Sequence, residues 1–201
     1  MIAALLLAAG RSSRFGADKL VAPLGGRPVI RWSAEALASR TDVTYVVVPP
    51  DHPAIEGALH GLDVVFVPHE GRDEGLGSSI GAGIAALPHD TEAVVIALAD
   101  QPFISPTVVA RLVARWRAGG ASAVAPRYRN GRGHPVLFDR TSFVDLLSLR
   151  GDVGARIVLE ALGDRGALID VEGAVPIDVD TPAALLAIAR ELDDAGVPPS
   201  R

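Results

Sequence analysis

Cysteine is absent from this chain of 201 residues, which excludes disulfide bonds, thiolate metal sites and cysteine nucleophiles. Aromatic residues make up only 4% of the sequence, so the core must consist mainly of aliphatic side chains. Apolar residues account for 49% and charged residues for 21%, which is typical of a globular chain rather than a disordered one. No internal repeat is apparent, and a chain of this length is expected to form a single domain.

Long runs of one charge are also missing, although the formal net charge is −5. Binding to nucleic acid or to a membrane surface requires a concentrated basic face, so the sequence predicts neither partner. The apolar stretch 1–9 has no basic residue before it and is too short to span a bilayer, which favours a buried first strand over a secretory segment. Together with the lack of cysteine, these features lead us to expect a cytoplasmic protein.

Short apolar runs bounded by turn residues alternate with segments of helical periodicity. Runs of this kind are typical of strands covered on both faces, and we expect strands at Ile2–Leu7, Val43–Val48, 64–67, Ala93–Leu98 and 121–125. Helical spacing predicts helices at 28–39, 53–59, 78–87, 106–118, 140–147, 154–162 and 182–192. The alternation indicates an α/β fold over residues 1–194, a single-domain Rossmann-like three-layer sandwich with a mostly parallel central sheet.

Two segments depart from this alternation. Residues 127–138 contain an Asn-Gly pair and a further glycine between extended stretches, which predicts a hairpin-like excursion. Residues 195–201 contain two prolines and no periodicity, and we predict a disordered tail there. Ser105 and Thr181 each precede a proline at a predicted helix start, so we expect them to cap the helices that follow.

The loop after the first strand is the first candidate site, because ligands of open α/β sheets bind beyond the carboxyl ends of the strands. From Ala8 to Lys19 it reads A-A-G-R-S-S-R-F-G-A-D-K, with glycines and hydroxyls among two arginines and a lysine. Backbone N–H groups and cations of this kind can bind a polyphosphate. The spacing fits neither the dinucleotide-binding fingerprint nor the P-loop of NTPases, and an ordinary polar loop is the alternative interpretation.

Aspartates follow two further predicted strands. Asp100 lies at the tip of the fourth strand and before a Gln-Pro pair, where it presents a hard oxygen ligand suited to Mg²⁺, although such a residue is more often a turn or capping residue. Asp178 and Asp180 follow an expected late strand and alternate along an extended segment, so both could approach one ion. Asp180 could instead cap the final helix, although Thr181 is available for that role.

Small and polar residues gather in later segments. Segment 75–83 is rich in Gly and Ser, so a ligand could approach its backbone while Ser78 or Ser79 caps a helix. Polar clusters also surround His134 and occupy 149–156, and a lone histidine is more often structural than catalytic. We assign no role to the remaining histidines, which show no metal-ligand spacing: His52, His60, His69 and His89.

The first loop, written L-A-A-G-x-S-x-R-F-G-x-x-K, resembles the motif of the MobA-like nucleotidyltransferases, and the likeness extends from Leu7 to Pro182. The resemblance implies that the loop wraps the phosphates of an NTP, that Arg14, Lys19 and Asp100 are catalytic, and that Mg²⁺ is the cofactor. It places the metal on Asp100 and Asp180. The nucleotide-binding residues that it implies are Ala8, Ala9, Gly10, Ser12, Arg14, Lys19, Gly77, Ser78, Ser79 and Asp100.

Within this family the chain looks closest to the molybdenum cofactor cytidylyltransferases. The features that favour them are the Ala-Ala-Gly turn, Gln101 after the metal-binding aspartate, and the segments G-H-P-V-L-F and G-D-x-G-A-R. The resemblance makes CTP the favoured nucleotide, a molybdopterin-type phosphorylated molecule the acceptor, and a molybdenum hydroxylase the candidate recipient of the product. The acceptor-binding residues that it implies are Gln101, Gly133, His134, Asp152 and Arg156.

The implied reaction is in-line attack by the acceptor's terminal phosphate on the α-phosphorus of CTP, with pyrophosphate leaving. A phosphate monoester is already nucleophilic at neutral pH, so the protein must mainly position the reactants and neutralise charge. Two alternatives remain open. A relative could use GTP or another NTP with a different phosphorylated acceptor, or a non-transferring accessory or redox relative could only bind a cofactor. The second is disfavoured because Arg14, Lys19, Asp100 and Asp180 are all present.

Overall fold

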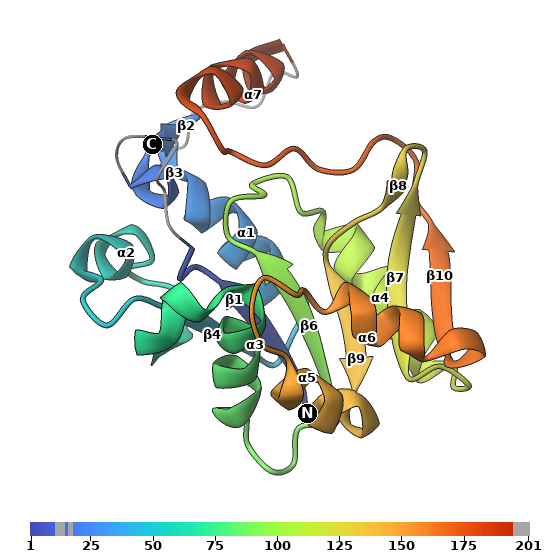
Figure 1. Cartoon of the computed structure of the whole chain (residues 1–201). Coiled ribbons are helices and arrows are strands. Elements are labelled where there is room, and N and C mark those ends of the chain that lie inside the picture. The colour runs from blue at the N-terminus through green and yellow to red at the C-terminus, as the bar shows by residue number, and fades with distance from the viewer. Residues whose placement is uncertain (11–14, 16–17, 195–201) are drawn as a thin grey trace.

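The computed structural model describes residues 1–10, 15 and 18–194. The predicted phosphate-binding residues Ser12 and Arg14 and the predicted tail 195–201 lie outside the described residues. The described chain forms one central sheet with helices on both faces (Figure 1), which confirms the predicted three-layer α/β architecture.

The central sheet has eight strands and is mostly parallel. In spatial order its path is β10 (Gly166–Asp170), β7 (Ala123–Tyr128), β9 (Val136–Asp139), β6 (Ala93–Leu98), β1 (Ile2–Leu7), β4 (Val43–Val48) and β5 (Val64–Pro68), while β8 (Gly131–Arg132) pairs with β7. The strands β2 (Pro23–Leu24) and β3 (Arg27–Pro28) form a separate two-stranded sheet. The carboxyl ends of β1 and β6, which are parallel neighbours, therefore lie together at one edge.

The described chain contains α-helices and 3₁₀ helices, and most of the α-helices cover one face of the sheet or the other. They are α1 (Val29–Ala38), α2 (Pro53–Ala58), α3 (Leu76–Ala85), α4 (Pro106–Arg117), α5 (Phe143–Ser148), α6 (Arg156–Ala161) and α7 (Pro182–Asp194), with the 3₁₀ helices η1 (Lys19–Val21), η2 (Glu70–Glu74), η3 (Arg140–Ser142) and η4 (Gly163–Arg165). Every helix in this part of the chain is too short or too polar to cross a membrane.

Strand β1 shows why the sheet is buried on both sides. Ala4 and Leu6 belong to the core cluster that contains buried residues of α1, α2 and α4. Ala3 and Leu5 belong to the opposite cluster, with buried residues of α3, α5 and α6. Because alternate side chains point to opposite faces, a strand covered on both sides must be apolar throughout, as β1 is.

A third, smaller core lies beyond the carboxyl edge of the sheet. Ile188 and Leu192 of α7 pack there with Leu24, Val29 and the fully buried Val179. Figure 1 shows α7 next to β2 and β3, and joined to β10 by a long extended segment that crosses the top of the sheet. We call residues 171–180 the strap. It connects the main fold to this third core.

The second half of the sheet differs from the sequence prediction. The Asn-Gly signal is confirmed as the β7–β8 hairpin, but the returning chain is no excursion, because β9 inserts between β6 and β7 and pairs antiparallel with both. Strand β10 was not predicted, since it lies at a sheet edge and alternates in burial instead of forming a continuous apolar run. The strand expected before Asp178 is wrong, because the strap is extended but unpaired there.

Helix ends follow the predicted chemistry in part. Thr181 caps α7, with its Oγ1 accepting a hydrogen bond from the Ala184 N–H at 3.1 Å. Ser105 precedes α4 without a side-chain capping bond. Helix α3 starts at Leu76, so neither Ser78 nor Ser79 is a cap; both are buried inside its first turns.

Candidate active site

Three charged side chains converge at the carboxyl edge of the sheet. The Lys19 Nζ donates hydrogen bonds to Asp100 Oδ2 at 2.6 Å and to Asp180 Oδ1 at 2.9 Å. Lys19 begins η1, Asp100 follows the end of β6 by two residues, and Asp180 ends the strap, so the three residues are far apart in sequence. The structure therefore places both predicted metal ligands, Asp100 and Asp180, around the ammonium of Lys19, a predicted catalytic residue.

Asp100 lies just beyond the carboxyl end of the central strand β6. The preceding residue, Ala99, bonds its N–H to Leu7 O at 3.1 Å, and its carbonyl accepts the Ser33 hydroxyl at 3.2 Å. Asp100 itself accepts the Val179 N–H through its backbone carbonyl at 2.9 Å. Its backbone is thus fixed to β1 on one side and to the strap on the other.

Asp180 is positioned by its neighbours in the strap rather than by a sheet. Val179 is fully buried in the third core, and Thr181 caps α7 directly after Asp180. The side chain of Asp180 remains 49% exposed, against 21% for Asp100 and 11% for Lys19. The two carboxylates therefore reach solvent although the ammonium between them is largely buried.

Within the trio of Lys19, Asp100 and Asp180, the surroundings of the lysine favour its charged form. Burial alone lowers the pKa of Lys19, but hydrogen bonds and charge attraction from Asp100 and Asp180 outweigh it and raise the pKa. Partial burial raises the pKa of the neighbouring Asp178 carboxyl, helped by the charges of the two other aspartates and opposed by a hydrogen bond from Gln101. The site thus carries a compact cation within a group of three carboxylates.

Three of the predicted acceptor-binding residues lie beside this trio. The Gln101 Nε2 donates to Asp178 Oδ1 at 2.7 Å, and His134 lies close enough to Asp178 and Asp100 for their charges to act on it. Burial lowers the pKa of His134, so its ring is neutral near pH 7. Among the residues that the structure describes, no hydrogen-bond partner reaches the buried acceptors Gln101 Oε1 and His134 Nδ1. Gly133 packs against Tyr128 and Val175.

The predicted nucleotide-binding residues after β1 divide by burial. Ala8 and Ala9 continue the alternation of the strand, with side chains in opposite core clusters, so only their backbones can meet a ligand. Gly10 is exposed, and the space around its Cα is open. Lys19 is the next predicted residue that the structure describes, and its Nζ donates to the carboxylates of Asp100 and Asp180.

The segment predicted to build the nucleotide pocket packs closely against the 149–152 loop. Gly77 N–H bonds Gly151 O at 2.9 Å, and a Cβ on Gly75 would overlap the Gly151 backbone, so glycine is required there. Ser78 is 7% exposed and donates to Gly71 O at 2.8 Å, while its Oγ lies 2.9 Å from His69 Nε2. Ser79 is buried as well.

The contact between His69 and Ser78 could not be predicted from sequence, because a single histidine in a loop has no diagnostic spacing. Asp152 follows Gly151 and is exposed next to the start of α3. Arg156 lies farther along, on the exposed side of α6, where its Nε donates to Glu160 Oε1 at 2.8 Å. In the described part of the chain, neither Asp152 nor Arg156 forms a hydrogen bond or ion pair with Asp100 or Asp178.

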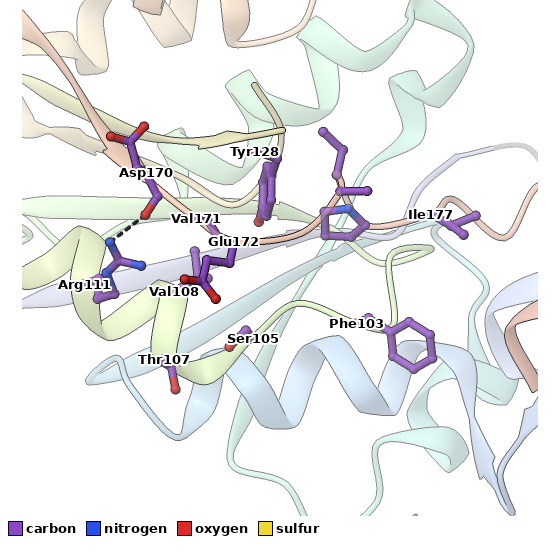
Figure 2. A pocket seen from close by; sticks show the side chains of 13 residues that line it. Phe103, Ser105, Thr107, Val108, Arg111, Tyr128, Asp170, Val171, Glu172 and Ile177 are labelled. Carbon is purple, nitrogen blue, oxygen red and sulfur yellow. Dashed lines mark hydrogen bonds between the residues drawn. The ribbon is translucent and has the colours of Figure 1, made fainter. Parts of the chain in front are cut away.

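A groove of about 860 Å³ lies between the strap and the start of α4. Figure 2 shows Phe103 and Ile177 at one end of it, Tyr128 above, and Glu172 reaching from the strap toward α4. Phe103 follows Gln101 by two residues, and Ile177 directly precedes Asp178. Both walls of the groove therefore belong to chain segments that adjoin Gln101 and Asp178, a proximity that no local sequence pattern predicts.

The donor set at the trio suits a magnesium or manganese ion. Mg²⁺ is commonly held by one or two carboxylates together with water and substrate phosphates, and Asp100 and Asp180 supply two convergent carboxylates. Among the residues that the structure describes, no group of three or more His, Cys, Asp or Glu side chains could hold a metal by itself. The residues present fit a metal that is completed by a bound nucleotide.

Comparison with known proteins gives several relatives. The chain is 32% identical over 192 residues to the purine catabolism protein PucB of Bacillus subtilis, covering 89% of this chain and 91% of that protein. It is 32% identical over 192 residues to nicotine blue oxidoreductase of Paenarthrobacter nicotinovorans, covering 90% and 92%. It is 36% identical over 135 residues to molybdenum cofactor guanylyltransferase of Cereibacter sphaeroides, covering 66% and 65%.

Solved structures share the whole fold. The Rv0371c homolog from Mycobacterium sp. strain JC1 superposes with a TM-score of 0.83 at 31% identity, covering 96% of this chain and 98% of that one. Rv0371c from Mycobacterium tuberculosis H37Rv in complex with manganese gives 0.78 at 27% identity, covering 94% and 98%. The family model of the MobA-like NTP transferase domain matches residues 4–166, and the chain therefore belongs to the MobA-like NTP transferase family.

Proposed function

We propose that this protein transfers CMP from CTP to the terminal phosphate of a molybdopterin-type acceptor, with release of pyrophosphate and with Mg²⁺ as cofactor. The observation that carries the proposal is the convergence of Lys19, Asp100 and Asp180 at the carboxyl edge of the sheet. Membership of a family of NTP transferases supports the reaction class. A related structure that contains manganese supports a divalent cation.

The residues divide into a nucleotide side and an acceptor side. Asp100 and Asp180 would hold the metal, which when bound supplies positive charge to the triphosphate and to the departing pyrophosphate. Lys19 and the open backbone at Gly10 would bind the phosphates, as would Ser12 and Arg14. Gly77, Ser78 and Ser79 would shape the wall of the nucleotide pocket, and Ala8 and Ala9 would contribute backbone only.

The acceptor would enter from the side of the strap. Gln101 and His134 carry buried, unpartnered acceptor atoms beside Asp178, and such atoms are costly unless a donor completes them. We propose that N–H donors of the acceptor do so, with its ring system lying in the groove between Phe103 and Ile177. Gly133, Asp152 and Arg156 would complete this side. The acceptor's phosphate needs no strong base, so these residues position it rather than deprotonate it.

A pyrophosphate assay with separate nucleotides tests the proposal. The protein is incubated with Mg²⁺ and molybdopterin and with CTP, GTP, ATP or UTP in turn. We expect the highest kcat/KM with CTP and no product in excess EDTA. A preference for GTP, the nucleotide suggested by the guanylyltransferase relative, would reject the cytidylyl assignment and leave nucleotidyl transfer in place. A cytoplasmic location and delivery of the product to a molybdenum hydroxylase belong to the same proposal.

A cofactor-binding or redox role without transfer is the second candidate. It is favoured by the 32% identity to a protein named nicotine blue oxidoreductase. The presence of Lys19, Asp100 and Asp180 in one cluster disfavours it, because a chain without transferase chemistry has no need for that arrangement. Absence of pyrophosphate with every nucleotide, in protein that is folded and metal-loaded, would support this second role.

A further inference from the structure

The cation at the centre of the site is chemically unlike every other cationic side chain of the protein. The sequence contains 18 arginines and a single lysine, and that lysine is Lys19. An arginine guanidinium is a broad planar fork, whereas a lysine ammonium is a compact point charge on a flexible stem. The one lysine side chain of the protein thus lies where two carboxylates converge.

The ammonium lies where a shared metal ion would have to lie. Asp100 Oδ2 and Asp180 Oδ1 are 2.6 and 2.9 Å from Lys19 Nζ, and a cation that contacts both oxygens must occupy the space between them. A divalent ion and the ammonium cannot share this point, because both need the same oxygens and their charges repel each other. The contacts seen here and a metal that bridges these same two oxygens are therefore mutually exclusive.

We propose that Lys19 is an exchangeable internal cation, which neutralises Asp100 and Asp180 while no nucleotide is bound and gives way to the divalent ion that enters with the NTP. This inference rests on the proposed function. When the phosphates draw the ammonium away, the metal gains both carboxylates, so nucleotide and metal strengthen each other's binding. Metal without nucleotide binds weakly, because it must displace Lys19 with nothing to receive the ammonium.

The local structure permits the side chain to move while the backbone stays. Asp18 caps η1 by accepting the Leu20 N–H at 3.2 Å, and Lys19 O accepts the Ala22 N–H at 3.3 Å. These bonds hold the backbone on either side of the Lys19 Cα. The carboxylates are the more exposed partners, so solvent and a hydrated metal can reach them from outside.

Manganese binding without nucleotide gives the decisive test, because it does not depend on activity. Mn²⁺ affinity is measured by electron paramagnetic resonance for the parent, Lys19→Met and Lys19→Arg. We expect Lys19→Met to bind Mn²⁺ on the order of tenfold or more tightly than the parent, since a competing charge-assisted hydrogen bond is lost. Lys19→Arg keeps the charge and should bind as weakly as the parent. Equal affinity in the parent and in folded Lys19→Met would overturn the exchange.

A double variant separates this inference from the proposed function. In Lys19→Met/Asp100→Asn the gain in Mn²⁺ affinity should disappear, because one of the two shared oxygens is replaced. If the gain persists, the metal lies elsewhere and its placement on Asp100 in the proposed function is wrong. If Lys19→Met shows no gain while Asp100→Asn in the parent loses nucleotide-dependent Mn²⁺ binding, the metal site stands and only the exchange fails. Circular dichroism checks that each variant is folded.

The single lysine also allows its movement to be observed directly. Protein labelled with ¹³C at lysine Cε has one such side-chain signal in its NMR spectrum, since no second lysine is present. We expect Mg²⁺ alone at low millimolar concentration to leave this signal in place and Mg²⁺ with CTP to shift it. A shift of the same size with Mg²⁺ alone would show that the metal displaces Lys19 without nucleotide and would reject the proposed coupling.

Discussion

Asp100 and Asp180 accept hydrogen bonds from the same ammonium, yet the chain supports them in different ways. Asp100 follows a central strand whose residues are buried between two helical layers, and its neighbour is bonded to β1. Asp180 ends the strap, whose last residues are held by the bond from Val179 N–H to Asp100 O and by burial of Val179. One carboxylate is fixed by the main core, whereas the other depends on the small third core.

The difference has a functional meaning under the proposed reaction. A ligand on the main core is in place before the substrates arrive, whereas a ligand on the strap can adjust as nucleotide and acceptor enter. Segments supported by few apolar contacts open more readily than a core strand does. The strap also forms one wall of the groove, so its position links metal binding to the acceptor side.

Replacing each carboxylate in turn should separate the two kinds of support. We expect Asp100→Asn to lower kcat/KM by about 10²–10³, the usual cost of removing one well-placed charged group from such a site. Asp180→Asn should cause a smaller loss, together with a higher Mg²⁺ concentration at half-maximal rate, because Asp180 is the more exposed ligand. Steady-state kinetics over a Mg²⁺ series measure both effects. A larger loss for Asp180→Asn would reverse the assigned roles.

Shortening Val179 tests whether the third core positions Asp180. Val179→Ala removes fully buried methyl groups and should lower the free energy of unfolding by about 1–3 kcal/mol. It should also raise the Mg²⁺ concentration at half-maximal rate, because the strap loses its anchor.

Val113→Ala is the matched control for this change. Val113 is buried in the main core on α4, far along the chain from the strap. It should cost similar stability, measured by urea unfolding, without changing the Mg²⁺ requirement. If both variants shift that requirement equally, Val179 has no special role in positioning the metal ligand.

The parallel strands β1, β4, β5 and β6 could be predicted from sequence, because burial on both faces requires a continuous run of apolar residues. Strands β1, β4, β5 and β6 are short apolar runs, and they were predicted within a residue of their observed ends. Once these strands are placed, the rule that ligands bind at their carboxyl ends identifies Asp100. That part of the candidate site follows from local patterns.

The remaining parts depend on long-range pairing that no local pattern encodes. The insertion of β9 between β6 and β7 is decided by tertiary packing, and edge strand β10 has too few apolar residues to stand out. A late strand was expected before Asp178, where the chain instead forms the extended strap outside the sheet. In the structure Val179 is buried in the third core instead. The contacts of Lys19 with Asp100 and Asp180 also join segments far apart in sequence, so no local pattern predicts them.

The pH dependence of the free energy of unfolding should report on His134, which lies close to Asp100 and Asp178. Burial lowers the pKa of His134 below its ordinary value of 6.5, so the native ring stays neutral while the unfolded chain takes up a proton below that pH. The associated stability is present above pH 6.5 and is lost as pH falls through 6.5 toward the lower native pKa. His134→Gln should flatten this acid-side decline in urea unfolding between pH 7.5 and 5. Exposed His60, replaced in the same way, should leave the slope unchanged.

Arg156 gives the smallest expected effect on stability, because it lies at the surface rather than on either core. Its pair with Glu160 is 78% and 45% exposed, and exposed pairs contribute little to folding. We therefore expect Arg156→Ala to leave the thermal midpoint unchanged. If Arg156 binds the acceptor as proposed, the KM for the acceptor should rise while the KM for CTP stays constant. Glu160→Gln removes the competing carboxylate and should leave the acceptor KM equal or lower. An unchanged acceptor KM in Arg156→Ala would exclude Arg156 from the acceptor site and leave that side to Gln101 and His134.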